Sequence, residues 1–118
     1  MDNMVWAVIM AVAFFVAYRA FNAFKFSRGA VVVKEKIQNG AAIIDVRSPG
    51  EFASGHYPGA RNIPVDQLSS RLKELGKKEN SIIVYCASGG RSSMAKRILD
   101  SAGFSDVTNG GGLGNMPA

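Results

Sequence analysis

Residues 81–92 decide the fold, and they read Ser-Ile-Ile-Val-Tyr-Cys-Ala-Ser-Gly-Gly-Arg-Ser. The apolar, β-branched run that ends at Cys86 predicts a buried strand. The two glycines and the arginine predict a tight loop, and Ser92 is expected to open an amphipathic helix. Cys86 would then face the loop amides and the positive end of a helix, where a thiol ionises readily.

A second apolar run, residues 42–46, predicts another strand earlier in the chain. It is followed by the pattern of a capping box, in which Ser48 and Glu51 flank Pro49 at the first helical position, so a short helix should end near Ser54. Apolar strands that alternate with helices favour a parallel α/β sheet covered on both faces. Sites in such sheets lie at the carboxyl ends of the strands, where Cys86 would be.

The remaining local patterns predict two further helices, one strand and one turn. Ser27 is expected to cap a helix over residues 31–38, and Asp66 a helix whose leucines face one side. A short strand is predicted around Val107, and residues 109–112 are expected to form a turn. Glycines should end the helices, namely Gly40, Gly76 and Gly103.

The length, net charge and cysteine count of the chain limit the classes of protein to which it can belong. A length of 118 residues favours one domain. The single cysteine excludes an internal disulfide and fits a reducing compartment. The net charge of +5 is spread along the chain, which argues against a nucleic-acid partner. One cysteine and one histidine supply too few soft ligands for a metal site, and no cofactor is expected.

The N-terminal segment is predicted to anchor the protein in a lipid bilayer. Residues 4–18 carry no charge, and continuing to Phe24 adds only Arg19 and Asn22 as polar interruptions. At ~1.5 Å per residue, residues 4–24 would form a helix of about 31 Å, which matches the ~30 Å hydrocarbon layer. A cleaved signal peptide and a buried core helix are the alternatives. The start is acidic, however, and the one Ala-x-Ala pattern lies inside the apolar run.

Basic residues follow the apolar run rather than precede it. By the positive-inside rule this predicts a single-pass protein with residue 25 onward in the cytoplasm, where the basic residues after the span would meet anionic lipid. The predicted division is an anchor and juxtamembrane segment at 1–26 and a globular domain at 27–118. The basic residues concerned are Arg19, Lys25, Arg28, Lys34 and Lys36.

Beyond these local patterns, two stretches resemble the signatures of the rhodanese family. Residues 44–52 (Ile-Asp-Val-Arg-Ser-Pro-Gly-Glu-Phe) with 55–64 resemble the first signature, and residues 84–92 resemble the active-site loop. The resemblance covers about residues 29–114. It implies a small α/β domain with a five-stranded parallel sheet flanked by helices. The transmembrane helix that the apolar run predicts before this domain does not follow from the resemblance. It also implies transfer of sulfane sulfur through a cysteine persulfide.

Cys86 is the candidate nucleophile. The alternative is a structural role, as a small apolar side chain buried in the core. The amides of the loop are expected to stabilise a persulfide anion, with Gly89 and Gly90 permitting the backbone to curl around it. The hydroxyls of Ser88 and Ser92 are further candidate donors, and Ser92 is alternatively only a helix cap. The predicted anion-binding set is Ala87, Ser88, Gly89, Gly90, Arg91 and Ser92.

Arg91 has two interpretations of equal weight. It either holds the donor's sulfonate and lowers the pKa of the thiol, or it forms a structural pair with Asp45 or Glu51. The resemblance implies that Asp45, Arg47 and Glu51 mainly hold loops together. His56 lies in a turn signature, which favours a loop-fixing hydrogen bond over a role as general base.

The predicted function is therefore a sulfurtransferase acting on a small anionic sulfur donor such as thiosulfate, with cyanide or a thiol as acceptor. Two alternatives belong to other classes: a membrane-tethered sulfur carrier or redox-sensing module, and a cysteine-dependent phosphatase. Such phosphatases have five residues between cysteine and arginine, whereas four separate Cys86 from Arg91 here. The tighter loop favours sulfur. The donor, the acceptor and the oligomeric state stay open.

Overall fold

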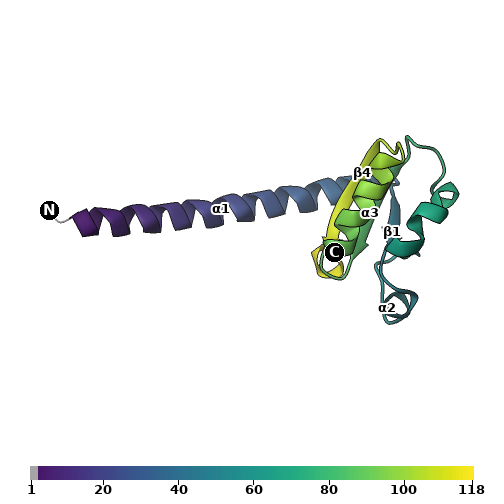
Figure 1. The fold of residues 1–118 in the computed structure, drawn as a ribbon, viewed down its shortest axis with the longest axis horizontal. Helices are drawn as coiled ribbons and strands as arrows, with labels where there is room; N and C mark the ends of the chain where they lie inside the picture. The colour runs from purple at the N-terminus through teal and green to yellow at the C-terminus, as the bar shows by residue number, and fades with distance from the viewer. Residues whose placement is uncertain (1–2) are drawn as a thin grey trace.

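The structure is a computed structural model that describes residues 3–118, except for the side chains of residues 22–28. The described residues form a parallel sheet in the order β2-β1-β3-β4, flanked by helices (Figure 1). The strands are β1 (Ala42–Asp45), β2 (Arg61–Asn62), β3 (Ser81–Cys86) and β4 (Asp106–Gly112). The α-helices are α1 (Asn3–Gln38), α2 (Pro49–Ala53) and α3 (Gly90–Ser101), and the 3₁₀ helices are η1 (Val65–Ser70), η2 (Leu72–Leu75) and η3 (Leu113–Asn115).

The central strand β3 sends alternate side chains to two separate cores. Ile82, Val84 and Cys86 lie on the face covered by α3, η1 and η2. Ile83 and Tyr85 lie on the other face, under the last turns of α1 and the C-terminal segment. Side chains of a β-strand point alternately to the two faces of the sheet, so β3 contributes to the core on each face. The predicted α/β sheet with two covered faces is confirmed.

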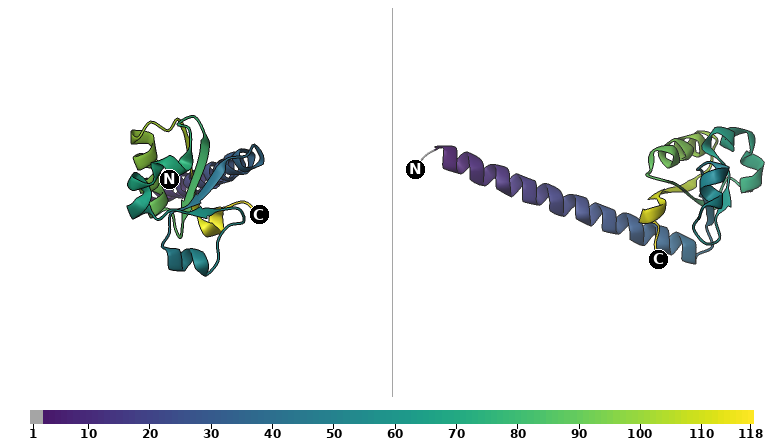
Figure 2. Two further views of the ribbon diagram at one scale, coloured as in Figure 1. Left: turned by 90° about the vertical axis from the view of Figure 1, so that its right-hand side faces the viewer. Right: turned by 90° about the horizontal axis from the view of Figure 1, so that it is seen from below.

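Helix α1 is continuous over 36 residues, or about 54 Å at ~1.5 Å per residue. Its first part extends away from the α/β domain (Figure 2). Residues Asn3–Phe21 are long and apolar enough to span a membrane, and none of this stretch is buried in the structure. A signal sequence would have the same length and composition.

The C-terminal end of α1 belongs to the α/β domain. Val33 is 4% exposed and packs in the second core, and Lys36 Nζ lies 2.7 Å from Asp106 Oδ1 at the start of β4. The prediction that a separate helix begins after Ser27 is wrong, because α1 runs through this position. The side chains of Ser27, Lys25 and Arg28 lie outside the described residues.

The capping box before α2 is confirmed. Ser48 Oγ accepts from the Glu51 amide at 3.3 Å, and the Glu51 carboxylate accepts from the Ser48 amide at 3.1 Å. The helix after the cysteine loop begins at Gly90 rather than at Ser92, because Gly89 adopts the N-cap position with a φ of +107°. The interpretation of Ser92 as an N-cap is therefore wrong.

Three other expectations fail. Asp66 does not cap an α-helix: the segment folds as η1 and η2, and their buried residues Leu68 and Leu75 still face the core. The glycines of 109–112 are not a turn but the end of β4. The described sheet has four strands rather than five, because the chain before β1 is the helix α1.

Candidate active site

Cys86 ends β3 and turns its sulfur toward the loop that follows. The residue is 1% exposed, and the amide of Gly89 donates to Sγ at 2.9 Å. Ser92 Oγ lies 3.5 Å from Sγ and 3.0 Å from the carbonyl oxygen of Gly89. Since a hydroxyl proton can rotate between two acceptors, Ser92 is able to donate to the sulfur when it carries a charge.

Two opposing effects set the charge of this sulfur. Burial favours the neutral thiol and alone would raise the pKa of Cys86. Hydrogen bonds from the Ser92 side chain and from the amides of Ser92, Gly89 and Ser88 favour the thiolate. These bonds outweigh burial and hold the pKa of Cys86 below its usual value. The hydrogen bonds therefore support a thiolate on Cys86, whose side chain also packs in the core.

The rate of Cys86 alkylation by iodoacetamide should thus follow a titration with a midpoint below that of a free cysteine, about 8.5. Ser92→Ala removes one donor to the thiolate and should move this midpoint upward. Ser93→Ala is the matched control, because the Ser93 hydroxyl bonds the Gly89 carbonyl and not the sulfur. Equal midpoints for Ser92→Ala and the parent would show that the hydroxyl does not stabilise the charge.

The end of β4 forms the wall opposite the cysteine loop. Cys86 is paired in register with Gly112, after a bulge between Val84 and Tyr85 shifts the strand. A Cβ atom at Gly112 would lie 2.5 Å from the carbonyl oxygen of Ala87, which is backbone of the loop. Only glycine therefore lets β4 approach so closely. The sequence shows a run of glycines here. The local pattern of a turn does not reveal that this run pairs with β3.

Gly112→Ala should push the loop away from β4 and lower the free energy of unfolding by about 1–3 kcal/mol, the usual cost of overpacking. Its φ of −88° is open to alanine, so the effect comes from the contact and not from backbone strain. Gly114→Ala is the control, because a Cβ there meets nothing within 4 Å. Thermal unfolding of both variants measures the difference, and equal midpoints would contradict the close approach.

Arg91 forms a bidentate ion pair with Glu51 of α2. Its Nη1 and Nη2 donate to the two carboxylate oxygens of Glu51 at 2.6 and 2.9 Å. The bonds from Arg91, reinforced by those from Ser48, lower the pKa of Glu51 to about 2. The ion pair that the second interpretation predicts is present, and its partner is Glu51 rather than Asp45. The pair ties the cysteine loop to the capped helix α2.

Asp45 and Arg47 form a buried ion pair under the site. Arg47 Nη2 lies 2.7 Å from Asp45 Oδ2, and the two residues are 7% and 0% exposed. The hydroxyl of Tyr85 donates to the same carboxylate at 2.8 Å and accepts from the amide of Tyr57 at 2.9 Å. Burial would raise the pKa of Asp45, but the bonds from Arg47 and Tyr85 outweigh it and lower the pKa.

His56 lies apart from the sulfur, in the loop after α2. Its Nδ1 is 3.1 Å from the carbonyl oxygen of Phe52, and its ring stacks on the Phe52 ring at 3.8 Å. Arg47 Nη2 also donates to the carbonyl oxygen of Gly55 in this loop at 2.7 Å. These contacts hold the loop in place, as the turn signature around His56 predicts.

The structure thus divides the predicted site residues into two groups. The sulfur of Cys86 is surrounded by Ser88, Gly89 and Ser92. The remaining predicted positions are Ala87 in the loop and Gly90 at the start of α3. Asp45, Arg47, Glu51, His56 and Arg91 support the surrounding loops. Sequence reasoning missed Tyr85, Asn62 and Gly112. Asn62 Nδ2 donates to the carbonyl oxygens of Asp45 and Arg47, and no local pattern signals such long-range bonds.

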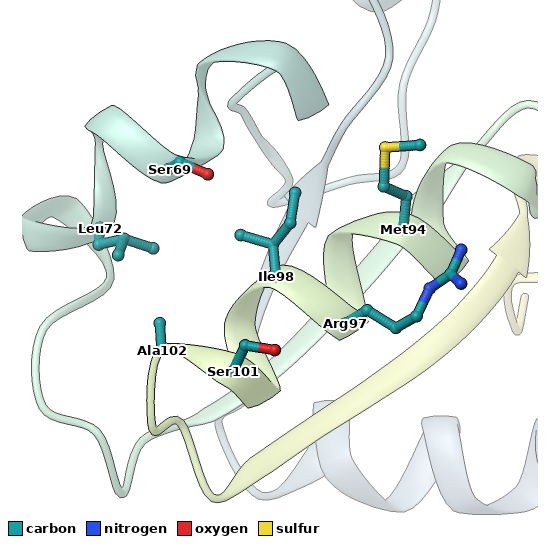
Figure 3. A pocket seen from close by; sticks show the side chains of 7 residues that line it. All are labelled: Ser69, Leu72, Met94, Arg97, Ile98, Ser101 and Ala102. Atoms are coloured by element: carbon teal, nitrogen blue, oxygen red, sulfur yellow. The ribbon is translucent and has the colours of Figure 1, made fainter.

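Two hollows lie on the described part of the α/β domain. A cleft of about 220 Å³ is bordered by the ends of β1 and α2, by η1 and by Arg91. A wider groove of about 480 Å³ runs between η2 and α3, where Leu72 and Ile98 point toward one another (Figure 3). Among the described residues, no group of three or more His, Cys, Asp or Glu residues has the arrangement to hold a metal ion. The absence of a metal or cofactor stays a prediction.

Comparison with known proteins assigns the domain to one family. Residues 30–112 match the model of the Rhodanese-like domain. An uncharacterized protein of Bacillus subtilis, YqhL, is 34% identical over 112 residues, which cover 92% of this chain and 87% of the relative. Thiosulfate sulfurtransferase PspE of Escherichia coli is 39% identical over 71 residues, which cover 59% of this chain and 68% of the relative.

Solved structures show the same fold. A rhodanese from Escherichia coli, determined with anions, superimposes with a TM-score of 0.63 at 37% identity, covering 66% of this chain and 95% of the other. A human single-domain sulfurtransferase superimposes with a TM-score of 0.56 at 31% identity, covering 62% of this chain and 76% of the other.

Proposed function

The chain belongs to the rhodanese family of sulfurtransferases, and from this premise we propose that it transfers sulfane sulfur through a persulfide on Cys86. Its donor is thiosulfate or a related sulfane compound, and its acceptor is cyanide or a thiol. The observation that carries the proposal is the Gly89 amide 2.9 Å from Sγ, within a loop whose amides and hydroxyl favour the thiolate.

In the first step the Cys86 thiolate attacks the outer sulfur of thiosulfate. A bond forms between Sγ and that sulfur, the S–S bond of the donor breaks, and sulfite leaves with the bonding electron pair. The product is a Cys86 persulfide anion. Hydrogen bonds from the loop, which already stabilise a charge at Sγ, are placed to stabilise a charge one atom further out.

In the second step the acceptor attacks the outer sulfur of the persulfide. Cyanide forms a carbon–sulfur bond, the Sγ–S bond breaks, and thiocyanate departs while the electron pair returns to the Cys86 thiolate. No proton donor is required in either step, because the leaving groups are stable anions at neutral pH. Among the described residues, the hydrogen-bond partners of Sγ are backbone amides and the Ser92 hydroxyl, which is compatible with this chemistry.

Arg91 distinguishes this proposal from phosphatase chemistry. In a cysteine-dependent phosphatase the loop arginine binds the phosphoryl oxygens, whereas both terminal nitrogens of Arg91 bind Glu51. The loop also has one residue fewer between cysteine and arginine. Both observations favour the transfer of a sulfur atom over the binding of a tetrahedral phosphate.

Steady-state kinetics with thiosulfate and cyanide test the proposal. Thiocyanate should form with ping-pong kinetics, seen as parallel double-reciprocal lines when one substrate is varied at several levels of the other. Hydrolysis of p-nitrophenyl phosphate, measured on the same preparation, should stay at background. Phosphate release that depends on Cys86, with no thiocyanate formed, would overturn the proposal.

We further propose that residues 4–24 anchor the protein in a bilayer as a single pass, with the domain from residue 27 onward in the cytoplasm. The exposed apolar part of α1 supports this. The full chain should remain in the membrane fraction after a carbonate wash. A membrane-impermeant thiol reagent should label Cys86, the only cysteine, in lysed but not in intact cells. Recovery of the full chain with Met1 intact in the soluble fraction would overturn the anchor.

A further inference from the structure

The cleft of about 220 Å³ is lined by Arg91, which follows the cysteine loop, and by Val46 at the end of β1. Its floor includes Val46, whose amide donates to the carbonyl oxygen of Tyr85 at 3.0 Å, so it lies at the strand end next to Cys86. Val46 and Cys86 also pack in the same core, on the same face of the sheet. A small molecule held in this cleft would contact Val46, which neighbours the end of β3, and Arg91.

Half of the residues that line this cleft are apolar and half are polar or charged. Pro49, Pro64 and Val65 supply much of its wall, and Ser48 and Gln67 supply uncharged polar groups. Two lining residues are charged, Arg91 and Asp66. The charge that a substrate meets here is therefore decided by these two side chains.

Their charges are not equivalent. Arg91 is held by both oxygens of Glu51, so its positive charge is already neutralised by a bidentate partner. Asp66 is exposed, and within the described residues its carboxylate forms no ion pair and no hydrogen bond. Counting Arg91, Glu51 and Asp66 together leaves one uncompensated negative charge at the cleft.

We infer that Asp66 is a specificity-determining residue that favours acceptor thiols carrying a positive charge and disfavours anionic ones. The inference rests on the proposed function and names its acceptor class: a small aminothiol, in which an ammonium group lies within a few bonds of the sulfur. The thiolate of the acceptor attacks the outer sulfur of the Cys86 persulfide, the Sγ–S bond breaks, and the electron pair returns to Sγ. The released product is the acceptor's persulfide.

Three thiols of similar size test the inference: cysteamine, which is cationic, 2-mercaptoethanol, which is neutral, and 3-mercaptopropionate, which is anionic. The full chain is assayed with thiosulfate as donor, and sulfite release is measured. In a ping-pong mechanism the kcat/KM of the acceptor does not depend on the donor concentration, so an effect of Asp66 on thiosulfate does not enter. Comparing each thiol across variants also cancels its intrinsic nucleophilicity.

Asp66→Asn should lower kcat/KM for cysteamine about threefold, leave 2-mercaptoethanol unchanged and raise 3-mercaptopropionate about threefold, as one exposed charge in water predicts. These differences should shrink at high salt. Glu79→Gln is the matched control, because it removes the same charge from an exposed residue outside the cleft. It should leave all three values unchanged.

The outcomes distinguish failure of the inference about Asp66 from failure of the proposed sulfur transfer. Equal changes for all three thiols in Asp66→Asn, no change at all, or the same pattern in Glu79→Gln would overturn the role of Asp66 while sulfur transfer stands. No sulfite release by the parent with any of these acceptors or with cyanide would overturn the proposed function itself.

Discussion

Replacing Cys86 with serine should reduce thiocyanate formation from thiosulfate and cyanide by at least about a thousandfold, to the rate without enzyme. Loss of the nucleophile in a covalent mechanism typically costs several orders of magnitude. The physical reason is ionisation: the loop donors lower the pKa of a thiol that already titrates near neutrality, whereas a serine hydroxyl starts many units higher. An oxygen at this position also cannot carry the transferred sulfur as a persulfide.

The Cys86→Ser variant should keep its fold, because oxygen is smaller than sulfur and Ser92 and the Gly89 amide remain as partners. Its far-ultraviolet circular dichroism and thermal midpoint should stay close to those of the parent. Residual turnover within tenfold of the parent, in a folded variant free of contaminating enzyme, would exclude Cys86 as the sulfur carrier.

Asp45→Asn should be among the most destabilising single changes, with a loss of about 3–5 kcal/mol in the free energy of unfolding. The carboxylate is fully buried and bonds both Arg47 and the Tyr85 hydroxyl. Asparagine keeps the shape but leaves the buried guanidinium of Arg47 without a counter-charge. Urea unfolding measures the change, and Asp66→Asn is the control because its carboxylate is exposed.

The same pair gives the stability a defined pH dependence. Because the folded pKa of Asp45 lies below its unfolded value of about 3.9, its contribution is complete above that value and is lost as the pH falls through the folded pKa. The parent should therefore lose stability on acidification below about pH 4, and Asp45→Asn should lose less over the same interval. Parallel acid profiles for the two proteins would show that Asp45 is not held ionised by the fold.

Local chemistry made parts of this structure predictable. The β3 segment was identified by its apolar, β-branched run and the α2 cap by the spacing of Ser48 and Glu51, since each depends only on neighbours in the chain. The position of Cys86 at the end of a central parallel strand followed from the same reasoning. The shared signature residues then indicated the family.

Other parts depend on contacts between distant segments and were not predictable from local patterns. The glycines near residue 112 resemble a turn until β4 is paired with β3, and only the paired strands reveal the carbonyl of Ala87 in the space of a side chain. The sequence offered two carboxylates, Asp45 and Glu51, as candidate partners of Arg91. In the structure, Arg91 forms its ion pair with Glu51 of α2.

The 3₁₀ geometry of η1 and η2 was also not predicted from the sequence. The leucine spacing is compatible with an α-helix, and Leu68 and Leu75 do face the core as expected. The segment instead breaks at Arg71, whose side chain bonds Gln67 and Glu74 across the break. Such side-chain bonds between successive turns are too weak to be anticipated from hydrophobic periodicity alone.

The mass of Cys86 after exposure to thiosulfate tests the central claim most directly. The peptide that contains Cys86 should gain one sulfur atom, and treatment with cyanide should remove it with formation of an equal amount of thiocyanate. Removal by cyanide matters because a sulfinic acid adds nearly the same mass and is not reversed. Turnover of thiosulfate with Cys86 unmodified, or with only oxygen adducts on it, would contradict the persulfide account.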